Sequence, residues 1–450
     1  MTQTDLIAEA GGAVPIVSRS DLVVVGGGPA GIAAAISAAR NGLSVTLIER
    51  YPYLGGLASG GMVLVLDDMC NGAEITVRGL CAELIERMER IGLCVAPPEE
   101  DRRSDETLWR KWSRWGVFDF HSHQKPQPIC YAAAFDPDGF KRVANKMIAE
   151  AGVNLRLHSW FSRAIVEDGV VKGVVCDTKS GRQAIMGSVV VDATGDLDVA
   201  ASAGAPFTHG SYIVTTVFRL GGVDVEAAER FEYDEPDAFN AIDRAIKKLM
   251  GGSWDKWWLR TPLPGIVWCN CPHMVGYDGI KVEDLTRADF EGRDRIDAVL
   301  THARQHLPGF EKAFVVDVAP QIGVRQTRLL DGVYVVTKED VTRRRHFPDS
   351  VARGRDYYYP YRSMLPRNVG GLIVAGRHYS ATSSAQRISR EIPPCMAMGE
   401  AAGVAAALAL ESGVGVDAID VAKAQAILRR RGADPGDAPA ANATFDEAAA

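Results

Sequence analysis

A glycine-rich turn between two short apolar runs constrains this chain most. The run Leu-Val-Val-Val at 22–25 is typical of a buried parallel strand, and Gly26-Gly-Gly-Pro-Ala-Gly31 follows at once. Small and apolar residues then predict a helix at 32–40, and a second strand is predicted at 45–48, with Glu49 at its end. This order of strand, turn, helix, strand and acidic residue predicts that the chain binds a dinucleotide.

The glycines and the residues between them have distinct predicted roles. Gly26 permits the tight turn, Gly28 lets a pyrophosphate approach the backbone, and Gly31 lets the helix pack closely on the strand. The free N–H groups and the dipole at the start of the helix favour negatively charged phosphates, and Pro29 and Ala30 beside it are candidates for contact with the cofactor. The alternative is an ordinary glycine-rich connection without a ligand, which would not need the second strand and its acidic residue.

The segment after the second strand favours FAD over NAD. Glu49 is at the right distance to accept a hydrogen bond from a ribose hydroxyl. A chain that binds NAD usually continues here into its third strand, whereas this one carries glycine doublets at 55–56 and 60–61. Glycine lets the backbone lie close along a long ligand, although a flexible surface loop would also be rich in glycine. The cofactor-binding candidates from this segment are Arg50, Gly55, Gly56 and Leu57.

Composition argues against several classes of protein. The chain has 450 residues, enough for two domains, and its formal net charge of −7 with no basic tract argues against nucleic-acid binding. We expect no membrane contact and a cytoplasmic location, because we find neither a secretory signal nor an apolar stretch that could span a bilayer. The eight cysteines are scattered, Cys269 and Cys271 being the only close pair, and they predict free thiols with no metal site.

Further helices are predicted downstream. Leu80, Leu84, Ile85 and Met88 would share one face of an amphipathic helix at 77–92, and Asp136-Pro opens another helix that ends near 151–152. Tryptophans recur every third residue in the charged segment 96–127. A helix would place them on one face, which either docks on the core or forms an aromatic wall of a substrate site; they are Trp109, Trp112 and Trp115.

A three-stranded meander is predicted after the second of these helices. Its strands are expected at 155–166, 170–177 and 185–191, with glycine turns between them. The last strand leads into Val191-Asp-Ala-Thr-Gly-Asp196. Phe161 in the meander is a further candidate for cofactor contact.

Together, these segments resemble the FAD-dependent oxidoreductases of the two-dinucleotide-fold superfamily. The resemblance is strongest to the fumarate-reductase-like group related to the flavin subunit of heterodisulfide reductase, and it covers about residues 20–412. The motifs that carry it are 26–31 with Glu49, 191–196, Gly323-Val-Arg-Gln-Thr-Arg328, Tyr359-Pro-Tyr-Arg-Ser-Met-Leu-Pro366, 375–377 and 394–403. Members of the group often carry Asp-x-His ahead of the Tyr-Pro-Tyr segment, and this chain lacks that histidine.

The resemblance implies a fold and additional cofactor contacts. It implies an α/β protein with a Rossmann-like FAD-binding domain, made of a parallel sheet and a β-meander, and an inserted α+β substrate domain. The strand end Ala193, Thr194 and Gly195 would lie near the adenosine part of FAD, and Gly376 and Arg377 near its ribityl and phosphate part. The start of the last long helix would face the flavin, where its dipole stabilises negative charge, through Cys395, Met396 and Ala397.

We divide the chain accordingly. Residues 1–18 are predicted to form a loose leader, and residues from 433 onward a disordered tail rich in alanine, proline, glycine and aspartate. Within the proposed substrate domain, strands are expected at 212–220, 315–322 and 332–337 and a helix at 284–306. The FAD-binding domain comprises 19–95, 128–205 and 366–412, and the substrate domain comprises 206–365.

Several residues are candidates for handling a substrate. Five arginines fall in segments expected near the flavin, and an arginine can bind a carboxylate through two parallel hydrogen bonds. They are Arg325, Arg328, Arg362, Arg387 and Arg390, of which Arg325 and Arg390 are the strongest candidates. The candidate proton donors or acceptors are His273, His378 and the tyrosines at 357–359 and 361, above all Tyr359.

The predicted function is hydride transfer between FAD and a small polar substrate, most naturally an anion. The alternatives are a flavin-dependent oxidase or monooxygenase that uses O₂, and a flavin subunit of an electron-transfer complex. The chain has no second Gly-x-Gly-x-x-Gly motif and no Cys-x4-Cys after the first, which argues against a disulfide-reductase cycle with its own NAD(P)H domain. The expected partners are the small-molecule substrate and an external electron donor or acceptor.

Overall fold

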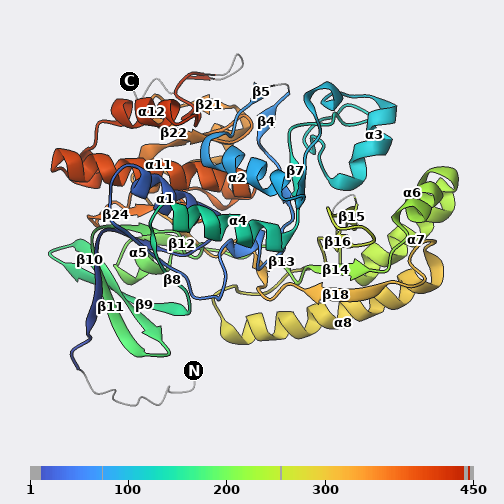
Figure 1. Ribbon diagram of the computed structural model, residues 1–450, viewed down its shortest axis with the longest axis horizontal. Helices are drawn as coiled ribbons and strands as arrows, with labels where there is room; N and C mark the ends of the chain where they lie inside the picture. The colour runs from blue at the N-terminus through green and yellow to red at the C-terminus, as the bar shows by residue number, and fades with distance from the viewer. Residues whose placement is uncertain (1–11, 73, 254–255, 440–443, 446–450) are drawn as a thin grey trace.

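The opening motif lies at the centre of a seven-stranded sheet in the computed structural model, which describes residues 12–72, 74–253, 256–439 and 444–445 (Figure 1). The strand order is β8-β2-β1-β11-β10-β9, and β24 also pairs with β11. The parallel strands are β8 (Asn154–Arg156), β2 (Val45–Ile48), β1 (Ile16–Val25), β11 (Gly181–Asp192) and β24 (Leu372–Val374). The antiparallel meander consists of β9 (Ser159–Glu167), β10 (Val170–Thr178) and β11.

The register of this sheet brings four carboxyl ends to one edge. Val25 at the end of β1 lies opposite Ile48 of β2 and opposite Asp192 of β11, which in turn lies opposite Val374 of β24. Ligands of open α/β sheets bind outside the carboxyl ends of the strands. The fold therefore gathers the segments that follow these four strands at one place.

Two helices rich in small residues pack against each other over this sheet. They are α1 (Pro29–Arg40) and α11 (Ile392–Ser412). A Cβ on Gly399 would fall 2.0 Å from the carbonyl oxygen of Ala30, so the close approach requires glycine there. Although α11 is long and apolar enough to cross a membrane, 89% of its most apolar window is buried inside the protein, as expected for a core helix. The surrounding helices are α2 (Gly79–Arg90), α4 (Pro137–Glu150), α5 (Asp198–Ser202) and α12 (Val421–Arg430).

A second apolar core lies between residues 218 and 313. It is built on the antiparallel order β15-β16-β14-β18 and includes the buried side chains of Phe218, Trp257, Trp258 and Phe310. The long helix α8 lies at the edge of this part of the molecule, beside α7 (Figure 1). The elements are β14 (Phe218–Gly221), α6 (Val225–Asp234), α7 (Pro236–Leu249), β15 (Leu259–Arg260), β16 (Val267–Cys269), α8 (Val282–His306) and β18 (Phe314–Val318).

Short sheets connect these two parts and cover their edges. They pair β7 with β3 and β6, β4 with β5, β13 with β17 and β19, β12 with β20, β22 with β23, and β21 with β25. The strands are β3 (Val65–Leu66), β4 (Cys70–Asn71), β5 (Glu74–Ile75), β6 (Cys94–Val95), β7 (Ala133–Phe135), β12 (Phe207–His209), β13 (Val214–Thr215), β17 (His273–Met274), β19 (Gly323–Val324), β20 (Arg328–Leu330), β21 (Arg345–His346), β22 (Ser350–Arg353), β23 (Tyr358–Pro360) and β25 (Thr444–Phe445). The remaining helices are α3 (Glu106–Trp112), α9 (Lys338–Thr342) and α10 (Ser383–Gln386), with short 3-10 turns at Gly56–Ala58, Glu99–Asp101, Ser113–Trp115, Tyr361–Met364 and Val416–Ala418.

Three predicted strands differ from the structure. The strand expected at 155–166 is two strands, β8 and β9, on opposite edges of the sheet, because His158 takes a left-handed conformation (φ 54°) between them. The strand expected at 212–220 is likewise interrupted into β13 and β14. The strand expected at 332–337 is absent from the described residues, where this segment forms only isolated bridges from Gly332 and Val336.

The predicted segment boundaries also need correction. Strand β1 begins at Ile16, so the end of the expected leader is ordered; residues 1–11 of that leader lie outside the described residues. The tail prediction was wrong for its first part, since Asp434 pairs with Arg353 at 3.2 Å, while residues 440–443 and 446–450 lie outside the described residues. Residues such as Val336, Tyr359 and Met364 pack into the main core rather than the second one. The division into a FAD-binding and a substrate domain otherwise stays a prediction.

The amphipathic and tryptophan-rich helices were largely predicted. The expected apolar face of α2 is buried, from Leu80 to Met88. The tryptophan segment forms α3 followed by a 3-10 turn, with Trp112 buried in a small cluster together with Leu108 and Phe118. These tryptophans serve packing, and none of the three lines the pocket described next.

Candidate functional site

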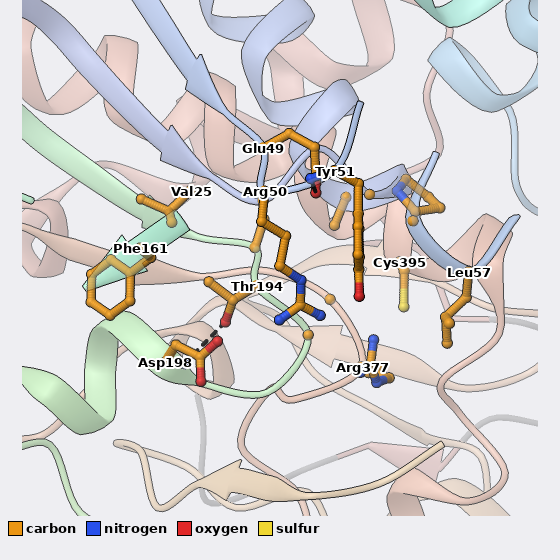
Figure 2. Close-up of a pocket in the computed structure, with 18 of the residues that line it drawn as sticks. Val25, Glu49, Arg50, Tyr51, Leu57, Phe161, Thr194, Asp198, Arg377 and Cys395 are labelled. Carbon is orange, nitrogen blue, oxygen red and sulfur yellow. Dashed lines mark hydrogen bonds between the residues drawn. The ribbon is translucent and has the colours of Figure 1, made fainter. Parts of the chain in front are cut away.

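A pocket lies at the carboxyl ends of the parallel strands. It holds about 930 Å³ of space, part of it open to solvent. In Figure 2, Arg50 and Tyr51 extend from the end of β2 into the space between Phe161 on one side and Leu57 and Cys395 on the other. Most of the predicted cofactor-binding residues line this pocket; they are Gly26, Gly28, Pro29, Ala30, Glu49, Arg50, Gly56, Leu57, Phe161, Ala193, Thr194, Gly195, Gly376, Arg377 and Cys395.

Four predicted cofactor-binding residues do not line the pocket. Gly31 packs against the turn before it, since a Cβ there would fall 1.8 Å from the carbonyl oxygen of Gly26. Gly55 takes a left-handed conformation against Ser59. Met396 is 1% exposed, and it and Ala397 belong to the core side of α11. The helix presents its first turn to the pocket through Ile392 and Cys395 instead.

Sequence reasoning missed eight lining residues. Val25 and Ile48 end the two parallel strands and could have been found from the strand prediction alone. The others come from segments whose direction the sequence did not reveal, such as the turn between β8 and β9. The missed residues are Val25, Ile48, Tyr51, Ser159, Trp160, Asp198, Gln321 and Ile392.

The three motif glycines are required for different reasons. A Cβ on Gly26 would lie 2.4 Å from the carbonyl oxygen of Ala193, and one on Gly31 would collide with Gly26, so both are required by protein packing. A Cβ on Gly28 would meet only the Cα of Gly56, at 3.9 Å, and its backbone angles (φ −73°, ψ −177°) suit any residue. Gly28 therefore keeps open space in front of the backbone, as an approaching phosphate requires.

Glu49 holds the glycine turn in place. One of its carboxylate oxygens accepts a hydrogen bond from the Gly27 N–H at 2.6 Å, and the other accepts one from the Tyr51 N–H at 2.8 Å. Burial raises the pKa of Glu49 above its ordinary value, although both hydrogen bonds oppose this shift. The carboxylate thus organises the cofactor loop, and its predicted contact with a ribose hydroxyl remains a prediction.

Two arginines bring positive charge to the pocket. Arg377 donates a hydrogen bond to Asp196 at 2.9 Å, beneath Gly195, where a Cβ would fall 2.2 Å from the guanidinium. Arg50 lies 4.0 Å from the same Asp196 and 5.0 Å above the ring of Tyr51. Below them, Thr194 accepts a hydrogen bond from the Asp198 N–H at 3.0 Å, which fixes the end of the second motif (Figure 2).

Aromatic rings form one wall of the pocket. Tyr51 stacks on Tyr53 with ring centroids 5.4 Å apart, and Trp160 meets Tyr51 edge-on at 5.9 Å. Trp160 is 51% exposed, which is unusual for so large an apolar ring. Flat exposed rings at a ligand pocket suit a planar aromatic ligand.

Of the two strongest substrate candidates, one lines the pocket and the other does not. Arg390 lines it directly, and its Nε is buried without a hydrogen-bond partner. Arg325 does not line the pocket but lies 3.3 Å from Nε2 of His273, through one guanidinium nitrogen. Burial and the charge of Arg390 lower the pKa of Arg325 to about 10. The pKa of His273 is lowered to about 4 by burial and by Arg325, so the imidazole is neutral at pH 7.

His378 and Tyr359 are not on the pocket wall. His378 is 1% exposed, and its Nε2 lies 3.1 Å from the backbone oxygen and 3.2 Å from the carboxylate of Asp192, beneath the strand ends. Tyr359 is fully buried and donates to the carbonyl oxygen of Ser389. Neither side chain lines the pocket, so their predicted catalytic contacts stay predictions.

The remaining candidate arginines have structural partners. Arg328 pairs with Asp198 at 2.8 Å, and Arg362 packs over Tyr334. Arg387 lies over the ring of Tyr212, with its guanidinium carbon 4.3 Å from the ring centroid.

These residues fit a long cofactor that carries phosphates. The helix α1 begins at the pocket without a side-chain cap and without an acidic residue in its first turn, so its N-terminal dipole is not neutralised. Gly28 leaves room beside it, and Arg50 and Arg377 add positive charge. The profile of the family described as FAD dependent oxidoreductase matches residues 21–358 and 354–428. This chain belongs to that family. FAD is accordingly the cofactor of this oxidoreductase.

The oxidoreductase also matches parts of curated proteins. It is 49% identical over 59 residues to a fumarate reductase (cytochrome) of Shewanella frigidimarina, covering 12% of this chain and 10% of that protein. It is 26% identical over 218 residues to digeranylgeranylglycerophospholipid reductase 1 of Methanococcoides burtonii, covering 47% of each. The matched regions thus span less than half of these relatives.

The chain also matches solved structures at low sequence identity. One is a geranylgeranyl bacteriochlorophyll reductase-like protein of Thermoplasma acidophilum, with 16% identity, a TM-score of 0.45 and coverage of 92% of this chain and 84% of that one. Another is L-amino acid deaminase of Proteus vulgaris, with 14% identity, a TM-score of 0.46 and coverage of 91% and 97%.

Proposed function

We propose that this FAD-dependent oxidoreductase transfers a hydride between the flavin and a small anionic substrate held by Arg390 and Arg325. The observation that carries the proposal is that Arg390, on the wall of the cofactor pocket, lies near enough to the buried Arg325 for its charge to act on that residue. Arg390 is 13% exposed, and its charge is one cause of the lowered pKa of Arg325. Like charges in a buried place repel each other, and an anion between them would relieve the repulsion.

The neighbouring groups support an anionic ligand rather than a cationic one. The carboxylate of Glu391 lies 3.5 Å from Arg390 and supplies one negative charge beside the two positive charges of Arg390 and Arg325. Burial and the charges of Glu391 and Asp68 raise the pKa of Asp67, which favours its neutral form. Glu391 alone does not balance the two guanidinium groups, and the raised pKa makes Asp67 a weaker counter-charge.

The chain also supplies a neutral base beside the proposed substrate. Bound FAD provides the two-electron chemistry, because the flavin accepts or donates a hydride. His273 stays neutral at pH 7 and lies against Arg325, so its ring can accept or return a proton as the substrate changes oxidation state. The two arginines would orient the substrate, since bidentate pairing fixes a carboxylate in one plane.

The test is anaerobic flavin reduction in lysine variants. FAD-loaded protein is mixed with a panel of small carboxylic acids, amines and alcohols, and bleaching of the flavin absorbance is followed per bound FAD. Lysine keeps the charge but loses the fork geometry, so Arg325→Lys and Arg390→Lys should each slow bleaching by roughly tenfold or more, about 1.4 kcal/mol. Arg293→Lys, on the exposed side of α8, is the matched control and should bleach at the wild-type rate.

Two results would contradict the proposal. The first is wild-type bleaching in both variants, and the second is bleaching by uncharged compounds alone. The FAD content of the Arg325→Lys variant should stay unchanged, because this residue does not line the cofactor pocket.

A further inference from the structure

A hydrogen-bond acceptor on the wall of the cofactor pocket lacks a donor. Gln321 lines the pocket, and its amide oxygen Oε1 is buried without a hydrogen-bond partner among the described residues. In folded proteins nearly all buried polar atoms are hydrogen-bonded, because an unpaired atom gives up its bonds to water without a replacement. The amide oxygen of Gln321 therefore indicates a donor that comes from a bound molecule.

Gln321 is anchored to the Leu57 side of the pocket. Its N–H donates to the carbonyl oxygen of Gly60 at 3.1 Å, and the Gly60 N–H donates to the carbonyl oxygen of Gly56 at 2.8 Å. Gly56 begins the 3-10 turn that contains Leu57. Figure 2 shows Leu57 on the opposite side of the pocket from Phe161. These hydrogen bonds hold the Gln321 backbone against the turn that forms this side.

The order of the motifs along the pocket indicates which half of FAD lies on this side. In a dinucleotide-binding fold, the acidic residue after the second strand lies by the ribose of the adenosine half, and the glycine turn lies by the pyrophosphate. Glu49 and Gly28 occupy these two positions, and Gly28 lies beside Gly56 at the start of the 3-10 turn. The flavin half would then extend past the glycine turn toward Leu57 and Cys395.

The flavin ring has one group that suits an unpaired acceptor. In oxidised flavin, N3–H is the N–H donor of the ring, and it lies between the carbonyl groups C2=O and C4=O. The pocket wall also carries two buried donors without a hydrogen-bond partner among the described residues, the Nε–H groups of Arg377 and Arg390. Of these three unpaired groups, the Gln321 amide oxygen alone is an acceptor. It is therefore the group that complements N3–H.

We propose that the amide oxygen of Gln321 accepts a hydrogen bond from N3–H of the flavin and so fixes the position of the ring. Among the described residues, Gln321 is the one pocket-lining residue from the stretch 206–365. Arg325 follows on the same segment, directly after β19, and contacts His273. One short segment thus carries both the contact to the flavin ring and the candidate substrate arginine. The proposal needs bound FAD and not the anionic substrate, so it is tested separately from the proposed hydride transfer.

The experiment compares the binding of FAD and of 3-methyl-FAD, in which a methyl group replaces the hydrogen on N3. Apoprotein of the full chain is titrated with each cofactor, and the quenching of flavin fluorescence gives the Kd. The wild type should bind 3-methyl-FAD roughly 5- to 100-fold more weakly than FAD, because the hydrogen bond is lost. Gln321→Leu should weaken FAD binding by a similar factor and leave 3-methyl-FAD binding nearly unchanged, because 3-methyl-FAD makes no such bond.

Two further variants complete the test. Gln321→Glu keeps an acceptor at this position and should keep the preference for FAD over 3-methyl-FAD. Gln305→Leu, which alters an exposed glutamine on α8, is the matched control and should bind both cofactors as the wild type does. Thermal unfolding of each apoprotein establishes that it is folded before titration.

Three results would overturn the proposal. The first is equal binding of the two cofactors by the wild type, which needs no variant to fold. The second is unchanged FAD binding in Gln321→Leu. The third is an equal loss of affinity for both cofactors in that variant, which would show that Gln321 acts on the pocket without contacting N3.

Discussion

Replacing Gly28 by alanine should separate cofactor binding from folding. A Cβ at this position meets only the Cα of Gly56, at 3.9 Å, and the backbone angles are allowed for alanine. The loss of a glycine N-cap and the reduced entropy of the unfolded chain are opposing effects of about 0.5–1 kcal/mol each. We therefore expect the melting temperature of the apoprotein to move by no more than about 2 °C.

The same methyl group should weaken FAD binding strongly. It would occupy the space in which the pyrophosphate approaches the backbone, and overfilling a packed contact costs roughly 1–3 kcal/mol. The Kd for FAD should therefore rise by roughly 5- to 150-fold. Titration of the apoprotein with FAD, followed by the quenching of flavin fluorescence, measures this change directly.

Substitutions of two other glycines serve as comparisons for this result. Gly31→Ala places a Cβ 1.8 Å from the Gly26 carbonyl oxygen, so it should destabilise the fold itself. Gly12→Ala meets no atom within 4 Å and lies away from the pocket, so it should change neither property. If Gly28→Ala binds FAD as tightly as the wild type, the phosphates do not lie against this turn, and the assignment of the motif is wrong.

Three further predictions concern single side chains. Glu49→Gln turns an NH₂ group toward one of the two backbone N–H donors, so one hydrogen bond is lost. Urea unfolding should show a free energy of unfolding lower by about 1–3 kcal/mol, and titration with FAD should show a weaker affinity. Trp160→Ala should weaken FAD binding by about 0.5–1.5 kcal/mol in the same titration, with little change in melting temperature. Burial raises the pKa of Glu400 from 4.5 to about 7. The folded state therefore holds this proton more tightly than the unfolded state, and the free energy of unfolding falls by ~3 kcal/mol as pH rises through this range. Glu400→Gln should remove that loss, and urea unfolding at pH 5 and pH 8 measures it.

The opening motif could be predicted because its signal is local. A buried strand, a glycine turn and a helix of small residues each constrain their own backbone, and the structure has all three where they were expected. The end residues Val25 and Ile48 then follow from the register, which aligns the strands at their carboxyl ends. The strand break at His158 had no such signal, because a polar residue in a left-handed conformation looks like any exposed strand residue.

The substrate end of the pocket depends on contacts that sequence cannot reveal. Arg325 and His273 are separated by about fifty residues and meet because β19 and β17 both pair with β13. Gln321 reaches the pocket because its N–H donates to the carbonyl oxygen of Gly60, at 3.1 Å, which joins two distant segments. Arg325 and Arg390 could be singled out from their motif segments, but the contacts that each candidate makes, such as the pairing of Arg328 with Asp198, could not.

Analysis of the flavin carried by the purified protein tests the central claim most directly. The account predicts a yellow protein that releases FAD on denaturation, identified by chromatography, in a ratio approaching one per chain. Apoprotein should take up added FAD and gain thermal stability as it does so. Release of FMN, or a colourless protein that neither binds FAD nor is stabilised by it, would contradict the account.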